Sequence, residues 1–356
     1  MNTRLCTKCV LPEGTPGISF DENGVCNYCT SYVPMQVSGE DELIEIFNEH
    51  KAKGNKYDCM IGVSGGRDST YTLWKLVNDY GLKVLAIHYD NPFTSPTAYR
   101  NIEKAAEILN VDVINWEYPH NAHMRSTKKT LKAWAKKPSA SLISLNCTHC
   151  KTIWPDLIKF AREKNTSLFV IGSNPLETAS FKQSSMGGAR TYHKLSNLPK
   201  ILKTVTKELA ANPSYLTSCS WSHVFKMYLY ASHSSPFSKW RFKDMTIIRL
   251  FDYIRWDVNE VESIITEKLE WEKSPEVEAT WRFDCRLDYV RRMMYLKTIG
   301  VTELRDLYSK MIRENMISRD EALEHLEKEE IIPMDVINNV LEPLDMKFSD
   351  FHFENK

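Results

Sequence analysis

The sequence lacks the features that mark membrane proteins and proteins of one dominant charge. No apolar run approaches the roughly 20 residues that a membrane-spanning helix needs. The first residues also lack the apolar core of a signal peptide. Lys and Arg number 46 and Asp and Glu number 46, so no net charge draws the whole chain to nucleic acid or to a membrane. We therefore expect a cytoplasmic protein with no membrane span.

Two motifs of nucleotide and nitrogen chemistry are also missing. The Walker A pattern G-x-x-x-x-G-K-S/T does not occur, which excludes the ordinary P-loop. No nucleophile motif of a glutaminase is evident, so the chain carries no sign of making its own ammonia. Disulfides are not expected either, because the nine cysteines include Cys-x-x-Cys pairs that suit a reducing compartment and metal binding.

The most informative stretch that is present is S-G-G-R-D-S-T, Ser64 to Thr70. It follows an apolar run, Cys59 to Val63, that is typical of a buried strand, and it leads into a helical pattern. Two glycines permit a tight turn with close backbone approach. A strand, a glycine turn and a helix start together predict an anion site, because the first helical amides face outward.

The first 40 residues carry two Cys-x-x-Cys pairs, Cys6 with Cys9 and Cys26 with Cys29. Two such pairs at this separation fit a tetrahedral zinc site, and four thiolates close the coordination shell. The sequence therefore predicts a structural zinc ribbon.

A strand–helix rhythm follows, which predicts an α/β fold with a doubly wound, mostly parallel sheet. The expected strands are 59–63, 83–89, 111–116 and 167–171. Ligands of such sheets bind at the carboxyl ends of the strands. These ends are His88 to Asn91 and Gly172 to Asn174, although His88 fits a core histidine equally well.

A third Cys-x-x-Cys, Cys147 and Cys150, stands before a predicted helix. One interpretation is a second metal site completed by Cys219 or Cys285. The other is a pair of thiols that pack at the start of the helix.

The loop resembles the S-G-G-x-D-S pyrophosphate (PP) loop of the adenine nucleotide α-hydrolase-like, HUP-type ATP pyrophosphatases. In those enzymes the loop holds the β- and γ-phosphates of ATP, and AMP passes to a substrate oxygen. The resemblance implies catalytic roles for Arg67, Asp68 and Ser69, with Arg67 neutralising phosphate charge and Asp68 binding Mg²⁺ or orienting the loop. Glu177 would help with Mg²⁺. The implied ATP ligands are Ser64, Gly65, Gly66, Asp68, Ser69, Thr70, His88, Asp90, Asn91, Gly172, Ser173 and Asn174.

Two further runs resemble the N-acetyl sugar amidotransferases of surface-polysaccharide and lipopolysaccharide biosynthesis. They are C-T-K-C-V-L-P-x₃-P-G-I-x-F-D-E-N-G-V-C-N-Y-C near the start and I-S-R-D-E-A near the end. This resemblance implies an ATP-dependent enzyme that converts the N-acetyl group of a nucleotide-linked sugar into an acetamidino group. Ammonia would come from partner glutaminase and ammonia-channel subunits.

The alternative is a PP-loop sulfurtransferase acting on tRNA or a small molecule. Thiolases of the superfamily resemble the chain at Cys147 and Cys150, where such a pair and one later cysteine hold a 4Fe-4S cluster. Nucleic acid would be a partner only in this alternative. A third class, a non-catalytic nucleotide-binding scaffold, is disfavoured by the intact loop.

We expect three parts: a zinc ribbon at 1–40, an ATP pyrophosphatase domain at 41–245 and helices at 246–356. The stretch 180–233 suits mobile substrate-binding loops, and 247–256 is expected to pack on the sheet. The run from Trp281 predicts an amphipathic helix that ends at Gly300. Arg282, Asp284 and Arg286 would either meet the substrate or form the exposed start of that helix.

Overall fold

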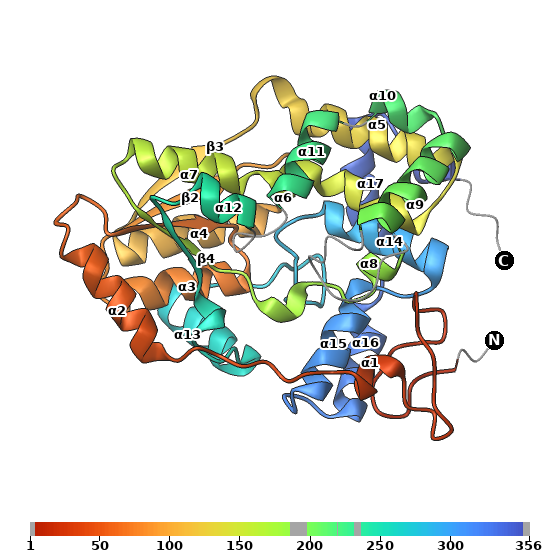
Figure 1. Ribbon diagram of the computed structural model, residues 1–356, viewed down its shortest axis with the longest axis horizontal. Helices are drawn as coiled ribbons and strands as arrows, with labels where there is room; N and C mark the ends of the chain where they lie inside the picture. Colours follow the sequence, from red (N-terminus) through yellow and green to blue (C-terminus); the bar gives the residue numbers. More distant parts are fainter. Residues whose placement is uncertain (1–3, 186–197, 219, 231–235, 352–356) are drawn as a thin grey trace.

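The computed structural model describes residues 4–185, 198–218, 220–230 and 236–351, built around a five-stranded parallel sheet (Figure 1). Its strands are β1 (Cys59–Val63), β2 (Val84–Tyr89), β3 (Asp112–Trp116), β4 (Leu168–Ile171) and β5 (Thr246–Arg249). Their spatial order is β3-β2-β1-β4-β5. The chain thus winds outward from β1 to β3 and then returns to the other side of β1, which places a switch point between β1 and β4. The predicted α/β fold is confirmed.

Side chains of the strands alternate between two apolar layers, as the pleat requires. On one face Ile61 lies in register with Ala86 and Val170, and Val170 with Ile248. Helices whose apolar residues join this layer include α2 (Glu40–Lys51), α3 (Arg67–Asn78), α4 (Pro96–Leu109) and α13 (Val258–Leu269). On the other face Met60 pairs with Leu85 and packs beneath α7 (Trp154–Glu163). The sheet is therefore doubly wound.

The carboxyl-terminal part is helical, as predicted. Its helices are α14 (Leu287–Ile299), α15 (Glu303–Arg313), α16 (Arg319–Glu329) and α17 (Met334–Leu341). The predicted capping box of α16 is present between Ser318 and Glu321. A second apolar core joins α14 and α17 to α5 (Ala122–Lys136) and to the amino-terminal cysteines. The two ends of the chain therefore share one core.

Shorter elements complete the described chain. The remaining α-helices are α1 (Asn27–Thr30), α6 (Thr148–Thr152), α8 (Lys182–Ser185), α9 (Leu198–Ala211), α10 (Ser214–Ser218), α11 (Trp221–Leu229) and α12 (Pro236–Arg241). A 3₁₀ helix, η2 (Ala140–Cys147), precedes α6. Within these described ranges, no helix has the length and apolarity to cross a membrane.

The predicted helix from Trp281 is wrong at its start, because α14 begins at Leu287. Backbone hydrogen bonds join Ser95 N to Asp284 O at 2.9 Å and Arg286 N to Phe93 O at 2.9 Å. These bonds use backbone groups that a helix would need, and Arg282 has a φ of 55°. The segment expected to pack on the sheet at 247–256 begins in edge strand β5, and its later residues Leu250, Phe251 and Trp256 pack in the apolar layer on one face of the sheet. Part of the stretch assigned to substrate loops, 186–197 with Gly187 and Gly188, lies outside the described residues, as does Cys219.

Candidate functional site

The Ser64–Thr70 loop connects β1 to α3 at the carboxyl end of the central strand. Gly65 has a φ of 75°, and a Cβ atom there would overlap the carbonyl oxygen of Ala98. A Cβ atom on Gly66 would lie 3.2 Å from Cγ of Asp284. The loop is therefore a narrow backbone cradle that requires glycine, and the amino-terminal amides of α3 open onto it. This shape fits a phosphate group, although the ATP contacts predicted from the sequence stay predictions.

Hydroxyl groups fold the loop onto itself. Ser64 N donates to Ser69 Oγ at 3.2 Å, and Ser69 Oγ donates to Gly66 O at 3.2 Å. Thr70 Oγ1 also donates to Gly66 O, at 2.9 Å. The loop is thus held in shape by the side chains that the motif supplies.

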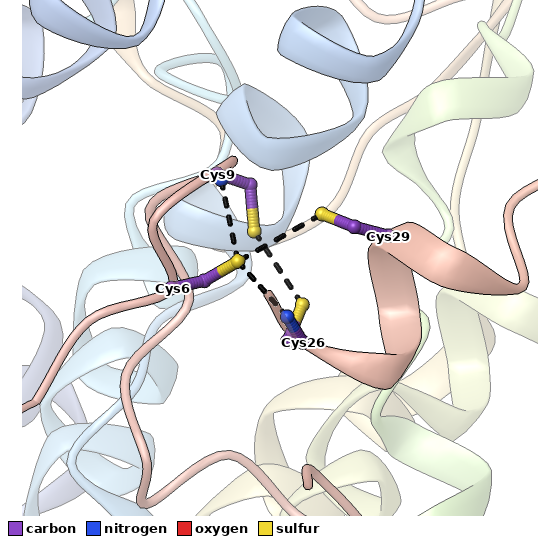
Figure 2. A group of neighbouring side chains, drawn as sticks. All are labelled: Cys6, Cys9, Cys26 and Cys29. Atoms are coloured by element: carbon purple, nitrogen blue, oxygen red, sulfur yellow. Dashed lines mark hydrogen bonds between the residues drawn. The ribbon is translucent and has the colours of Figure 1, made fainter. Parts of the chain in front are cut away.

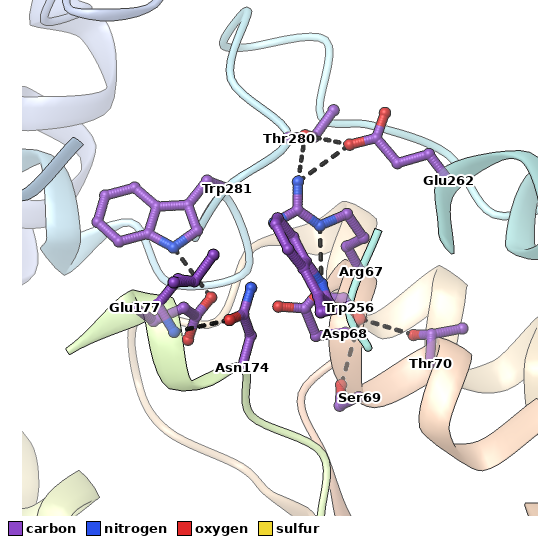
Figure 3. Close-up of polar contacts among 12 residues, drawn as sticks. Arg67, Asp68, Ser69, Thr70, Asn174, Glu177, Trp256, Glu262, Thr280 and Trp281 are labelled. Carbon is purple, nitrogen blue, oxygen red and sulfur yellow. Dashed lines mark hydrogen bonds and ion pairs between the residues drawn. The ribbon is translucent and has the colours of Figure 1, made fainter. Parts of the chain in front are cut away.

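Arg67 holds Asp68 in place, which the sequence did not predict (Figure 3). Arg67 Nε donates to Asp68 Oδ1 at 3.0 Å, and Trp256 Nε1 donates to the same oxygen at 3.0 Å. Arg67 Nη1 is bonded to Glu262 and Thr280 at 3.1 and 3.0 Å. Two of the three guanidinium nitrogens of Arg67 are therefore hydrogen-bonded to other residues of the protein, and Arg67 acts here as a positioning residue for Asp68. Oδ2 of Asp68 makes no hydrogen bond within the described part of the chain, so it is free to take a cation.

The loop after β4 passes against the start of α3. A Cβ atom on Gly172 would lie 2.9 Å from Cα of Ser69, and Ser173 is exposed. Asn174 is 2% exposed, and its Oδ1 accepts from Leu176 N at 2.7 Å. Its Nδ2 has no partner among the described residues and points into the space between Asp68 and Glu177 (Figure 3). A buried donor without a partner indicates a ligand oxygen at this point.

Two carboxylates besides Asp68 approach the mouth of the loop. Glu177 accepts from Trp281 Nε1 at 2.9 Å, and burial raises the pKa of Glu177 to about 7 despite the opposing charge of Arg282. Asp284 lies beside Gly66, and burial raises the pKa of Asp284 as well. Glu177 and Asp284 thus lie near Asp68, although among the described residues these three carboxylates do not bring their oxygens within 4.8 Å of one another. Asp284 and Arg282 belong to this crevice, whereas Arg286 pairs with Glu276 at 3.0 Å.

A buried group of charges lies beyond Glu177. Arg282 is 3.7 Å from Asp288 and 3.7 Å from Glu303. Arg291 and Lys182 also pair with Glu303. Three cations thus meet two carboxylates in this buried group.

The three predicted ligands at the end of β2 are placed differently: His88 is buried in the core, and Asp90 and Asn91 lie in the turn that follows. His88 is buried, with Nδ1 3.0 Å from Val63 O, and burial lowers its pKa. This geometry favours the core-histidine interpretation. Asp90 accepts from Tyr99 Oη, and Asn91 Oδ1 accepts from Phe93 N at 2.9 Å. Both residues shape the turn beside the Asp284 segment.

The raised pKa of Glu177 predicts that Mg²⁺ binding depends on pH. Mg²⁺ requires the ionised carboxylate, so its affinity for the complex with a non-hydrolysable ATP analogue should fall about tenfold per pH unit below 7. Calorimetric titration from pH 5.5 to 8.5 measures it. Comparison with Glu177→Gln at each pH cancels protonation of the nucleotide. An equal pH dependence in both proteins would contradict a role for Glu177 in Mg²⁺ binding.

The four amino-terminal cysteines form a cluster with the geometry of a metal centre (Figure 2). All are buried, and their sulfur atoms lie within 4.8 Å of one another. Cys6 Sγ is 4.0 Å from Cys29 Sγ, and Cys9 Sγ is 3.7 Å from Cys26 Sγ. A tetrahedron with Zn–S bonds of about 2.3 Å has edges of about 3.8 Å, so the spacing fits zinc. The prediction of a four-cysteine metal site is confirmed, and zinc as its metal stays a proposal.

The charge of this centre is balanced by Arg313 of α15. Its Nε lies 3.3 Å from Cys29 Sγ, and one Nη lies 3.5 Å from Cys9 Sγ. Backbone N–H groups of Lys8, Cys9 and Cys26 donate to Cys6 Sγ at 3.2–3.4 Å. Thiolates hydrogen-bonded in this way are the form that binds metal.

Cys147 and Cys150 lie near enough to Cys285 to affect its ionisation. Burial raises the pKa of Cys285, and the nearby Cys150 and Cys147 raise it further. Of the described residues, only the amino-terminal cysteines have three or more ligand atoms within 4.8 Å of one another. The structure thus brings Cys285 to the third Cys-x-x-Cys without closing a cluster.

Comparison with known proteins adds little to this geometry. No family model matches the chain. An uncharacterized protein of Methanocaldococcus jannaschii is 29% identical over 119 residues, which are 32% of this chain and 43% of that protein. The match therefore spans less than half the length of that curated relative.

Two solved structures are similar at a low level. A U34-tRNA thiolase from Methanococcus maripaludis with its 4Fe-4S cluster is 14% identical with a TM-score of 0.35, covering 97% of this chain and 88% of that one. NMN synthetase from Francisella tularensis is 14% identical with a TM-score of 0.28, covering 66% and 96%. These TM-scores carry no argument about function, so the case rests on the sheet order, the loop and the cysteines.

Proposed function

We propose that this protein is a PP-loop ATP pyrophosphatase-type enzyme and, more specifically, an N-acetyl sugar amidotransferase. It would adenylylate the N-acetyl oxygen of a nucleotide-linked sugar and replace that oxygen with ammonia, giving an acetamidino sugar, AMP and pyrophosphate. The observation that supports this best is the S-G-G-R-D-S-T cradle at the switch point of a parallel sheet.

The chemistry requires a better leaving group. An amide oxygen leaves poorly, so it first bonds to the α-phosphorus of ATP and pyrophosphate departs. Ammonia then attacks the amide carbon, gives up one proton, and the carbon–oxygen bond breaks as AMP leaves. The enzyme contributes positioning and charge stabilisation.

The residues divide this work between them. Gly65, Gly66 and the first amides of α3 would hold the pyrophosphate, and the donor Nδ2 of Asn174 would bind a nucleotide oxygen. Asp68 and Glu177 would hold Mg²⁺, which neutralises phosphate charge when it is bound. The buried group of charges around Arg282 and Arg291 would take the diphosphate of the nucleotide-linked sugar. Ammonia would be delivered by glutaminase and ammonia-channel partners, and the enzyme would work in the cytoplasm.

A second candidate function is sulfur transfer to tRNA or a small molecule. The observation that favours it is the approach of Cys285 to Cys147 and Cys150. These three thiolates would hold a 4Fe-4S cluster if they moved closer together, and such a cluster would supply an open iron for sulfide.

One double variant, Cys147→Ser/Cys150→Ser, distinguishes the two candidate functions. If the protein is an amidotransferase, ammonia-dependent AMP release with a UDP-linked N-acetyl sugar should fall by less than about tenfold, because no sulfur takes part in the reaction. The assay follows AMP in protein purified without oxygen, with iron measured on the same sample. Loss of both iron and activity in the double variant would favour the second candidate. So would AMP release by the native protein that does not depend on the sugar.

A further inference from the structure

Charge is distributed unevenly along this electrically neutral chain. Residues 119–243 contain 20 Lys and Arg but only 4 Asp and Glu. The rest of the chain contains 26 Lys and Arg and 42 Asp and Glu. The net positive charge of this basic part therefore equals the net negative charge of the rest of the chain. An anionic partner would attract the basic part and repel the rest, which would orient the molecule.

The basic part forms a continuous set of helices. Lys136 Nζ of α5 donates to Ser214 Oγ of α10 at 2.9 Å, and Trp221 Nε1 of α11 donates to Leu216 O of α10 at 2.9 Å. The ring of Tyr230, just after α11, lies 5.2 Å from that of Phe237 in α12. Figure 1 shows α5, α9 and α10 at the end of the molecule away from α2, with α11 and then α12 following toward the sheet.

Ten cations on these helices are exposed, and none of them forms a salt bridge with a carboxylate of the described residues. They are Arg125, Lys129, Lys132, Lys136, Lys137, Lys200, Lys203, Lys207, Lys239 and Arg241. We call the surface of these ten residues the basic surface.

Large apolar side chains stand exposed among these cations. Leu202 is 52% exposed and Leu216 is 55% exposed. Trp221, Phe225 and Trp240 are 39%, 65% and 69% exposed, and they are the exposed Trp and Phe side chains of the described chain. Exposed Trp, Phe and Leu side chains interspersed along basic helices are typical of a surface that contacts a partner.

We infer that the basic surface docks the protein onto an anionic phospholipid bilayer. Lysines attract anionic headgroups, and Trp, Phe and Leu between them enter the boundary of headgroups and acyl chains. The acidic remainder turns the molecule so that the basic surface faces the bilayer. Because no described helix could span a bilayer, the contact is made at the surface only.

The side-chain chemistry favours a bilayer over RNA. Proteins that bind RNA in single strands stack bases on aromatic rings and often grip phosphates with the fork of arginine. Here eight of the ten exposed cations are lysine, and two of the five exposed apolar residues are leucines, which cannot stack on bases. The inference is independent of the reaction proposed above, since none of these residues lines the crevice.

The test is sedimentation of the full protein with vesicles at physiological salt. One set of vesicles is half phosphatidylglycerol and half phosphatidylcholine, and the other is phosphatidylcholine alone. We expect binding to the first set only. Each lysine near such a surface contributes a factor of about five, so Lys200→Gln/Lys203→Gln/Lys207→Gln should weaken binding about 100-fold. Phe225→Ser/Trp240→Ser should remove the binding that persists at high salt.

A matched control neutralises three exposed lysines elsewhere, in Lys268→Gln/Lys328→Gln/Lys347→Gln, and should bind as the native protein does. Equal binding to neutral vesicles would overturn the inference. So would native binding by the Lys200/Lys203/Lys207 variant. Tight binding of a single-stranded RNA of about 20 nucleotides without vesicle binding would assign the basic surface to nucleic acid instead.

Discussion

Asp68→Asn and Ser69→Ala should each reduce the conversion of ATP to AMP by at least about 100-fold, with the fold intact. In Asp68→Asn the side chain keeps an oxygen for Trp256 but loses the negative charge that binds a cation and faces Arg67. In Ser69→Ala the hydroxyl that links Ser64 to Gly66 is gone, so the cradle is no longer held in its present shape. Both changes act on the part of the site where the phosphates would lie.

Asp79→Asn is the matched control, because Asp79 is a carboxylate at the far end of the same helix and pairs with Lys75 there. Its turnover should equal that of the native protein. The measurement is release of AMP and pyrophosphate, with circular dichroism to confirm folding. Native turnover in both loop variants, or release of ADP in place of AMP, would contradict the proposed mechanism.

Cys6→Ser/Cys26→Ser should lose the single bound zinc and much of the stability of the chain. Binding free energies of structural zinc reach about 10–16 kcal/mol in small zinc domains, and part of that energy supports folding. Cys9 and Cys29, the two sulfur partners of Arg313, remain in this variant, so the loss of stability reports on the metal and its other two ligands. We expect the midpoint of thermal unfolding to drop by about 10 °C or more.

Metal analysis of the purified protein and differential scanning calorimetry measure the two effects. Cys59→Ala is the control, since Cys59 is also buried but lies in β1, far along the chain from the metal centre. It should lose stability through a small cavity and keep its zinc. Full zinc in the double variant would contradict the assignment of the ligands.

Features encoded within a few residues could be predicted from the sequence. The loop follows from a glycine turn between an apolar run and a helical pattern, and the metal centre follows from the spacing of Cys6, Cys9, Cys26 and Cys29. The strands were predictable because four of them are apolar runs that end in polar turns. The fifth, β5, is a short edge strand of mixed polarity, Thr246–Arg249, and its pattern alone did not mark it.

Contacts between distant segments could not be predicted. Arg67 was assigned to phosphate, and its contacts with Glu262 and Thr280, which lie 195 and 213 residues further along the chain, were not visible in the sequence. Asp284 reaches the loop only because the segment 284–286 pairs with 93–95, which also delays the start of α14. Single-sequence patterns carry no record of such pairings, because the periodicity of a helix and the composition of a turn are local.

Arg313 is synthesised long after the four-cysteine centre that it contacts. The four cysteines are complete once the first 29 residues have left the ribosome, so metal can bind before the sheet exists. The guanidinium that balances them, and Arg319, which bonds the carbonyls of Cys6 and Cys9, are synthesised almost 300 residues later. Any metal that binds the amino-terminal cysteines at that stage does so without these two partners. Chains that stop short of α15 would leave a charged metal–thiolate centre exposed to chelators and oxidants throughout their lifetime.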